Sequence, residues 1–292
     1  MSTEDIDPVK PLPPPVVEDP ISLIPEFIDS DSSSYPPITP GGSLIIAWQI
    51  RNKRVLLVGG GNVAATRLVH LLNADALITL ISPPSGLHPE TAHRIKTHQH
   101  SITYIPRTFH LSDLNDPTIN LVLTAIDDPV ASTEIYTAAK KLKLPVNVAD
   151  VPPECDFYFG SVHRDGPLQI MVSTNGNGPK LAAMVRRQVA GSLANGTGEA
   201  IVKVGELRRK LRNAAPAKED GGKRMEWMSR VCEEWSFEEL AGMTGAQMDV
   251  LLRGFKEGKV EGYDEVVELA RVLEAATIDD AAVDAADNQE NR

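Results

Sequence analysis

Three consecutive glycines, Gly59, Gly60 and Gly61, constrain the fold of this chain more than any other stretch. They follow the apolar residues 55–58, which are typical of a buried strand, and precede residues 62–72, which are typical of an amphipathic helix. Strand, tight turn and helix in this order fit the pattern G-x-G-x-x-A of dinucleotide-binding folds. The alternative of a plain glycine turn without a ligand stays open.

Each small residue of the pattern has a predicted role. Gly59 allows the tight turn, Gly61 lets the backbone approach a pyrophosphate, and Ala64 lets the helix lie close to the strand. The N-terminus of the helix offers unpaired N–H groups and the positive end of its dipole to the phosphates. We therefore expect a dinucleotide site at this turn.

Composition limits the classes of protein that fit this chain. Of its 292 residues 42% are hydrophobic, which is enough for one large or two modest cores. No apolar run approaches the roughly 20 residues that span a bilayer, and the first residues do not form a secretory signal, so we expect a cytoplasmic protein without a membrane partner. A net charge of -11 argues against nucleic acid as a partner.

Cysteine and histidine patterns give no clear metal site. Only Cys155 and Cys232 occur, so neither a disulfide framework nor a C-x-x-C zinc pattern is present. Four histidines crowd one segment, but their spacing is irregular, and a polar surface helix explains them better than a metal does. These residues are His88, His93, His98 and His100.

The chain divides into five predicted segments. Residues 1–42 hold ten of the 22 prolines and read as a disordered extension. Strands and helices alternate over residues 43–150, which predicts an α/β, Rossmann-type parallel sheet domain with helices on both faces. The remaining segments are residues 151–195, residues 196–275 and an acidic tail, residues 276–292.

The character of the sequence changes after residue 150. Residues 157–162 and 168–173 read as two strands of a hairpin, and residues 180–193 as a helix, which together make a small α+β segment. Periodicity is helical over residues 196–275. The acidic, alanine-rich tail from residue 276 is predicted to be disordered.

The second predicted strand, residues 77–81, ends at Ser82, 23 residues after Gly59. A dinucleotide domain usually places Asp or Glu at this point, to bind the ribose hydroxyl. Neither an acid nor an adjacent Arg or Lys for a 2′-phosphate is present here. The residues alone therefore leave NAD and NADP open.

Five segments within residues 43–275 together are far more specific than a glycine motif alone. They are VGGGNVA at 58–64, VNVAD at 146–150, CDFYFG at 155–160, STNGNGP at 173–179 and KVGELRR at 203–209. In this order they resemble the siroheme synthase family, and in particular the fungal bifunctional precorrin-2 dehydrogenase and sirohydrochlorin ferrochelatase.

The resemblance implies NAD-dependent oxidation of precorrin-2 to sirohydrochlorin, followed by insertion of Fe²⁺ as a substrate to give siroheme. It also implies a homodimer built through residues 151–195, and a serine at position 82. The expected cofactor-binding residues are Gly59, Gly60, Gly61, Asn62, Val63 and Ser82.

Asp150 is the expected catalytic base. It ends a predicted strand at the carboxyl edge of the sheet, and the general base proposed for the family matches this position. A carboxylate that only caps the next turn is the structural alternative. Asp156 is the second candidate, although its place before an aromatic segment favours a structural role.

Cationic side chains should line the cleft of a tetrapyrrole substrate, because this substrate carries many carboxylates. The sequence does not show which of the basic residues do so; the candidates are Lys180, Arg186, Arg187, Arg208, Arg209, Lys210 and Arg212. Two other functions stay open: a precorrin-2 dehydrogenase that lacks chelatase activity, and a non-catalytic module that senses NAD.

Overall fold

A parallel α/β domain is the first folded part of the chain that the structure describes. The computed structural model describes residue 38 and residues 40–290, with side chains as far as residue 276. The disordered extension predicted for residues 1–42 lies outside the described residues, apart from residue 38 and residues 40–42.

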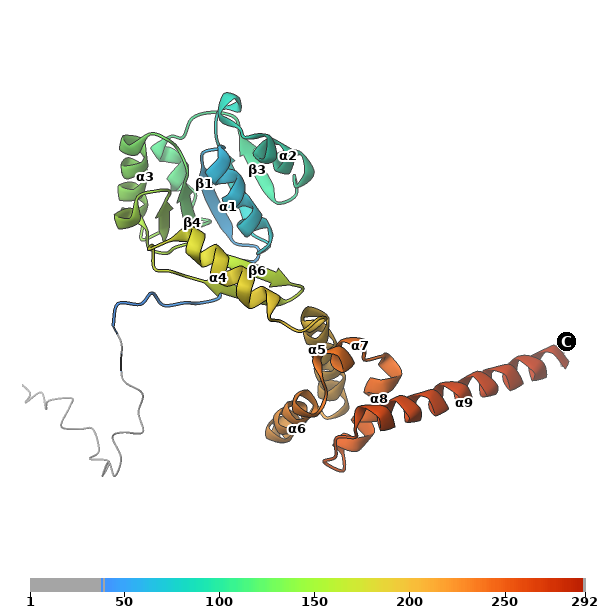
Figure 1. The fold of residues 1–292 in the computed structure, drawn as a ribbon. Coiled ribbons are helices and arrows are strands. Elements are labelled where there is room, and N and C mark those ends of the chain that lie inside the picture. The colour runs from blue at the N-terminus through green and yellow to red at the C-terminus, as the bar shows by residue number, and fades with distance from the viewer. Residues whose placement is uncertain (1–37, 39, 291–292) are drawn as a thin grey trace, which may run out of the picture. The chain divides into compact units, whose positions relative to one another are not determined.

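Five parallel strands form one sheet in the order β3-β2-β1-β4-β5, with β1 in the centre (Figure 1). In the register of the sheet, Val58 at the end of β1 lies beside Ile81 of β2 and Thr124 of β4. The carboxyl ends of these strands therefore meet at one edge. The strands are β1 (Arg54–Val58), β2 (Leu77–Ile81), β3 (Ile102–Ile105), β4 (Ile119–Thr124) and β5 (Val146–Val148).

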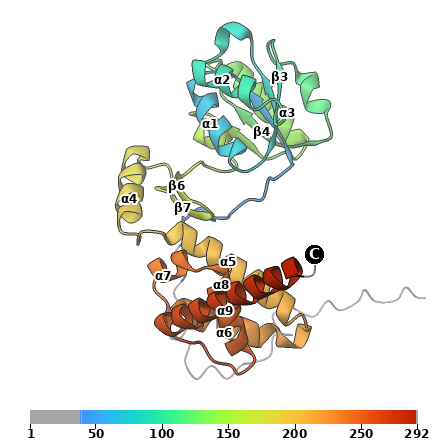
Figure 2. The ribbon, with the colours of Figure 1, turned by 90° about the vertical axis from the view of Figure 1, so that its right-hand side faces the viewer.

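Helices cover both faces of the sheet. Figure 2 shows the strands between α1 on one side and α3 on the other. Val55 and Leu57 of β1 belong to a core that contains α1, whereas Leu56 and Val58 belong to a core that contains α3. This alternation is the period of two of a strand that is buried on both faces. The helices of this domain are α1 (Asn62–Leu72), α2 (Pro89–Thr97) and α3 (Pro129–Lys141). The predicted Rossmann-type class is confirmed.

A two-stranded antiparallel hairpin of β6 (Ser161–Asp165) and β7 (Leu168–Val172) follows, and α4 (Pro179–Gly191) packs against both strands. The prediction of a strand over residues 157–162 was wrong at its start, since β6 begins only at Ser161. Phe157 and Phe159 pack instead against the core of the α1 face. Burying two aromatic rings there outweighs their preference for a strand.

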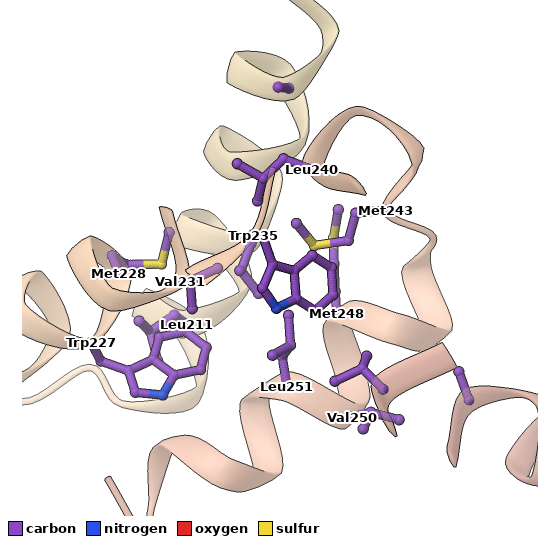
Figure 3. Packing of buried hydrophobic residues seen from close by; sticks show 14 residues of the cluster. Leu211, Trp227, Met228, Val231, Trp235, Leu240, Met243, Met248, Val250 and Leu251 are labelled. Atoms are coloured by element: carbon purple, nitrogen blue, oxygen red, sulfur yellow. The ribbon is translucent and has the colours of Figure 1, made fainter. Parts of the chain in front are cut away.

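The C-terminal part is helical, as predicted. One buried core joins its helices, and Figure 3 shows the rings of Trp227 and Trp235 inside it. The Trp227 indole donates to the carbonyl of Lys259 at 2.6 Å, and the Trp235 indole to the carbonyl of Glu261 at 3.2 Å. Both buried N–H groups are thus paired, as buried polar groups require. The helices are α5 (Thr197–Ala214), α6 (Gly221–Glu234), α7 (Phe237–Gly242), α8 (Gly245–Phe255) and α9 (Tyr263–Glu290).

The last helix differs from the prediction for the tail. α9 continues to Glu290, whereas a disordered tail was predicted from residue 276. Alanine recurs over residues 276–286 and is the residue that most favours a helix. Short 3-10 turns complete the fold, at Pro84–Gly86, Leu111–Asn115, Pro152–Glu154 and Lys218–Asp220.

Candidate active site

The glycine turn is shaped by close backbone contacts. Gly59 has a φ of 107°, and a Cβ atom there would overlap the carbonyl group of Ala125 just after β4. A Cβ atom on Gly60 would come within 2.7 Å of the Ser82 hydroxyl. Both positions therefore exclude a side chain because the protein itself fills the space.

Gly61 differs from its two neighbours. A Cβ atom there would meet no atom within 4 Å, and its φ of -73° is ordinary. Gly61 is the N-cap of α1, with no side-chain cap and no acidic residue in the first turn. The first N–H groups of α1 therefore face open space without a side-chain acceptor, as an anion site at a helix N-terminus requires.

A cavity of 830 Å³, here called the glycine-turn cavity, opens in front of this turn. Three aspartates border it, and among the described residues that line it none is Lys, Arg or His. Its principal lining residues are Gly59, Gly60, Gly61, Asn62, Val63, Ser82, Thr108, Asp127, Asp128 and Asp150. All six predicted cofactor-binding residues thus border one cavity of a size that suits a cofactor.

Ser82 lies opposite the glycine turn, at the end of β2. It is 2% exposed, and its carbonyl accepts a hydrogen bond from the Tyr104 hydroxyl at 2.9 Å. The hydroxyl of Ser82 donates to the carbonyl of Pro83 at 3.3 Å. The Ser82 side chain lies close against Gly60, where it would leave no room for a Cβ atom.

A second cavity of 600 Å³, here called the hairpin cavity, lies between α1, the end of β5 and the β6–β7 segment. Its lining includes Arg67 and His70 of α1, Asp150, Phe159 and Thr174. Ala149, Asp150 and Val151 border both cavities. The turn after β5 is therefore the wall that the two cavities share.

Asp150 is exposed at the centre of this wall. Its φ of 60° lies in the left-handed region, which Asp tolerates better than most residues. Hydrogen bonds from Ala149 to Thr124 at 2.9 Å and from Val151 to Val148 at 3.4 Å hold the turn. Among the described residues, none forms a hydrogen bond or an ion pair with the Asp150 carboxylate. Its carboxylate therefore lies between two cavities without a partner in the described part of the chain.

Asp156, the second candidate, is occupied by structural contacts. Lys140 of α3 donates to one carboxylate oxygen at 2.7 Å, and the N–H of Val146 donates to the other at 2.9 Å. Burial raises the pKa of Asp156, but the bonds to Lys140 and Val146 outweigh this, so that the pKa lies below its ordinary value. These contacts agree with the structural role favoured for Asp156.

Arg67 is a site residue that the sequence did not reveal. Its guanidinium carbon lies 4.0 Å from the centre of the Phe159 ring. Burial lowers the pKa of Arg67, while electrostatic interactions with Cys155 and Asp150 oppose this shift. The only signal in the sequence was its spacing, three residues after Ala64 and four before Leu71, which places a charge on the buried face of α1.

His70 and Cys155 complete the polar lining of the hairpin cavity. Burial lowers the pKa of His70, and the positive charges of Arg67 and Arg164 lower it further, so the imidazole is neutral at neutral pH. Burial raises the pKa of the Cys155 thiol, which lies 3.1 Å from the carbonyl of Val148. Cys155 is thus a protonated thiol in a hydrogen bond.

The other predicted groups lie away from both cavities or have partners. His88 accepts a hydrogen bond from the N–H of Glu90 and caps α2. Lys210 forms an ion pair with Asp249 at 2.5 Å, and Arg186 donates to the hydroxyl of Ser161 at 3.1 Å. Within the described residues, no group of three or more His, Cys, Asp or Glu side chains is arranged to hold a metal ion.

Three known families match successive parts of the chain. Residues 46–161 match an NAD(P)-binding family, residues 165–192 match the family described as sirohaem biosynthesis protein central, and residues 194–261 match sirohaem biosynthesis protein C-terminal. An NAD(P)-binding domain is therefore present.

Two yeast proteins are similar over most of their length. The siroheme biosynthesis protein met8 of Schizosaccharomyces pombe is 52% identical over 235 residues, which cover 80% of this chain and 88% of that protein. The siroheme biosynthesis protein of Saccharomyces cerevisiae is 37% identical, over 65% of this chain and 82% of that protein. A siroheme synthase of Tolumonas auensis is 36% identical, over 52% of this chain and 32% of that protein.

A solved structure shares the fold. The structure described as SirC, precorrin-2 dehydrogenase, covers 74% of this chain and 100% of its own chain with a TM-score of 0.54, at 16% sequence identity. The identity and coverage of the yeast relatives, together with the family matches, decide the assignment. The chain belongs to the family of siroheme biosynthesis proteins.

Proposed function

We propose that this protein oxidises precorrin-2 to sirohydrochlorin with NAD and then inserts Fe²⁺ to give siroheme, so that it acts as both a dehydrogenase and a lyase. The observation that carries this proposal is the position of Asp150. One unpaired carboxylate borders both the glycine-turn cavity and the hairpin cavity. A base placed there can reach a substrate that lies against a cofactor.

The glycine-turn cavity fits NAD. Open space at Gly61 and the uncapped N-terminus of α1 suit a pyrophosphate, whose charge the helix dipole stabilises. Among the described residues that line it, none is a cation that could bind a 2′-phosphate, and Asp127, Asp128 and Asp150 would repel one. We therefore infer that NAD binds in preference to NADP. Bound NAD⁺ supplies the hydride acceptor at C4 of its nicotinamide.

Asp150 would act as the proton acceptor in both reactions. In the oxidation, one carbon of precorrin-2 would lose a hydride to NAD⁺ while another atom of the substrate loses a proton, and the Asp150 carboxylate would take that proton. In the chelation, two pyrrole protons leave as Fe²⁺ enters, and the same carboxylate can receive them in turn.

We further propose a division of roles and a homodimer. Residues 43–150 would bind NAD, residues 151–195 would form the dimer, and residues 196–275 would form the helical domain. Exposed apolar side chains on α4 support the dimer, since Leu181, Met184 and Val185 recur at helical spacing and are 57%, 51% and 40% exposed.

We also propose that the protein works in the cytoplasm. Cys155 and Cys232 are free thiols, as in most proteins of a reducing compartment. Among the helices that the structure describes, none is long and apolar enough to cross a membrane.

The reactions can be followed by absorbance, first with precorrin-2 and NAD and then after addition of Fe²⁺. We expect NADH and sirohydrochlorin in the first phase and siroheme in the second. Formation of NADH without siroheme would show that the protein is a dehydrogenase without chelatase activity. Binding of NAD without formation of NADH or siroheme would favour a regulatory module.

Asp150→Asn tests the base. Asn keeps the shape and tolerates the left-handed conformation, but it lacks the basic oxygen, so both rates should fall by roughly 10² to 10⁴ while NAD affinity persists. Asp75→Asn is the matched control, because Asp75 also has a left-handed φ of 56° but borders neither cavity. Rates within about threefold of the parent in Asp150→Asn would refute the assignment.

A further inference from the structure

The hairpin cavity holds one permanent positive charge and one carboxylate. Among the described residues that line it, Arg67 is the only Arg or Lys and Asp150 is the only acid. His70, the remaining basic residue, is held neutral by its surroundings. Any anionic group that enters this cavity has a single cation to meet.

Arg67 is half-buried. Within the described part of the chain its guanidinium forms no hydrogen bond and no ion pair, and its guanidinium carbon lies 4.0 Å from the centre of the Phe159 ring. No Arg67 nitrogen is among the fully buried side-chain atoms that lack a partner. Its N–H donors are therefore accessible to a ligand, and a guanidinium offers several of them on one planar group.

The contact with Phe159 holds the charged group of Arg67 in place, because the face of an aromatic ring attracts a cation. Arg67 also lines the hairpin cavity from α1. A carboxylate that enters this cavity can bind a guanidinium with both oxygens, in the paired geometry that arginine favours.

We propose that Arg67 binds a carboxylate on the rim of the tetrapyrrole and so orients the macrocycle toward Asp150. The proposal rests on the proposed function and adds a substrate-binding residue to it. Arg67 and Asp150 do not form an ion pair with each other, although each lines the same cavity. The guanidinium is thus available to the rim of the substrate, and the carboxylate of Asp150 to its reacting atoms.

Binding of sirohydrochlorin without NAD or Fe²⁺, followed by absorbance titration, tests this proposal. In Arg67→Met, which keeps much of the apolar stem, we expect the affinity to fall about 10- to 100-fold, the usual range for a charge-assisted hydrogen bond. In Arg67→Lys the loss should be smaller, because the charge stays and the paired geometry is lost.

A second ligand separates charge recognition from general damage. Sirohydrochlorin whose carboxylates are converted to amides has no charge for Arg67 to meet, so parent and Arg67→Met should bind it with affinities within about twofold of each other. Arg51→Met is the control, since Arg51 is exposed and pairs with Asp75 outside the hairpin cavity. Unchanged NAD affinity and thermal midpoint would establish that the variants are folded.

The outcomes separate this inference from the proposed function. If Arg67→Met weakened the acid and the amide equally, or weakened neither, Arg67 would not bind a carboxylate. Failure of the parent protein itself to bind sirohydrochlorin would instead refute the proposed function, and this inference with it.

Discussion

At the scale of single residues, identical amino acids in this site have different physical roles. Gly59 is required by the protein, since its φ of 107° and the nearby Ala125 carbonyl exclude a side chain. Gly61 has neither constraint, so its lack of a side chain is explained by what must fit outside the protein. Only a glycine such as Gly61, which no internal contact or backbone angle requires, is informative about a ligand.

Gly61→Asp should therefore abolish NAD binding and leave the fold intact. The new side chain would enter the space in front of α1 and bring a negative charge to the place proposed for the pyrophosphate. We expect at least a hundredfold loss of NAD affinity by calorimetry, about 3 kcal/mol or more. The thermal midpoint should change little, because a Cβ atom at this position meets no neighbour within 4 Å.

Gly222→Asp is a suitable control for Gly61→Asp. Gly222 lies in the first turn of α6 and also has free space for a side chain, but it borders neither the glycine-turn cavity nor the hairpin cavity. The NAD affinity of this variant should equal that of the parent. If Gly61→Asp bound NAD as the parent does, the cofactor would not lie at this turn.

The aspartates show what the sequence could and could not predict. Their positions after β5 were readable, since an apolar run ending in Asp places a carboxylate at the edge of a parallel sheet. The sequence did not show that, among the residues that the structure describes, Asp150 is unpaired while Asp156 is paired. Lys140, which pairs with Asp156, is 16 residues away in the sequence, and only the folded α3 brings it close. Arg67 was missed for a similar reason, because an arginine on a helix usually faces solvent.

At the scale of secondary structure, the sequence predicted the elements whose own periodicity decides them. The central strands, α1 and the hairpin turn at Asp165-Gly166 are of this kind. Phe157 and Phe159 were assigned to a strand because aromatic residues favour strands. Contacts with rings that are distant in the sequence decide their position instead. The ring centre of Phe157 lies 5.7 Å from that of Trp48, and the ring centre of Phe159 lies 5.4 Å from that of His70. A window of local sequence does not contain that information.

Asp156 fastens α3 to β5, and its removal should lower stability in a pH-dependent way. Because its pKa is lower in the folded protein than in the unfolded chain, its contribution is complete above the unfolded pKa of about 3.9 and is lost as the pH falls through the folded value. Asp156→Asn should lower the free energy of unfolding at neutral pH by about 1 kcal/mol, since the pair with Lys140 is partly exposed.

Urea unfolding of Asp156→Asn at several pH values checks this expectation. The difference from the parent should stay constant down to about pH 5 and narrow below about pH 4. Lys140→Met and the double variant complete a cycle that isolates the pair. A difference that grew as the pH fell would contradict the assigned direction of the pKa shift.

At the scale of the whole molecule, the exposed face of α4 is the feature that a single chain does not explain. Ala182 of this helix is buried against its own chain, while Leu181, Met184 and Val185 lie in solvent. Together they form a continuous apolar stripe, and such a stripe usually contacts a partner. The segment from residue 151 to 195 is also small, and a hairpin with one helix has little core of its own. A second copy of the chain would cover the apolar stripe and add to the small core of this segment.

Met184→Glu should convert the proposed dimer into monomers. A carboxylate in an apolar interface must either be desolvated without a partner or be protonated, and the cost of several kcal/mol would weaken association at least a hundredfold. Sedimentation at micromolar protein should then give twice the chain mass for the parent and the single chain mass for the variant. Met225→Glu is the matched control, because Met225 is 66% exposed on α6, outside residues 151–195, and should leave the mass unchanged. A monomeric parent at this concentration would exclude the dimer, and a dimeric Met184→Glu would place its interface elsewhere than on α4.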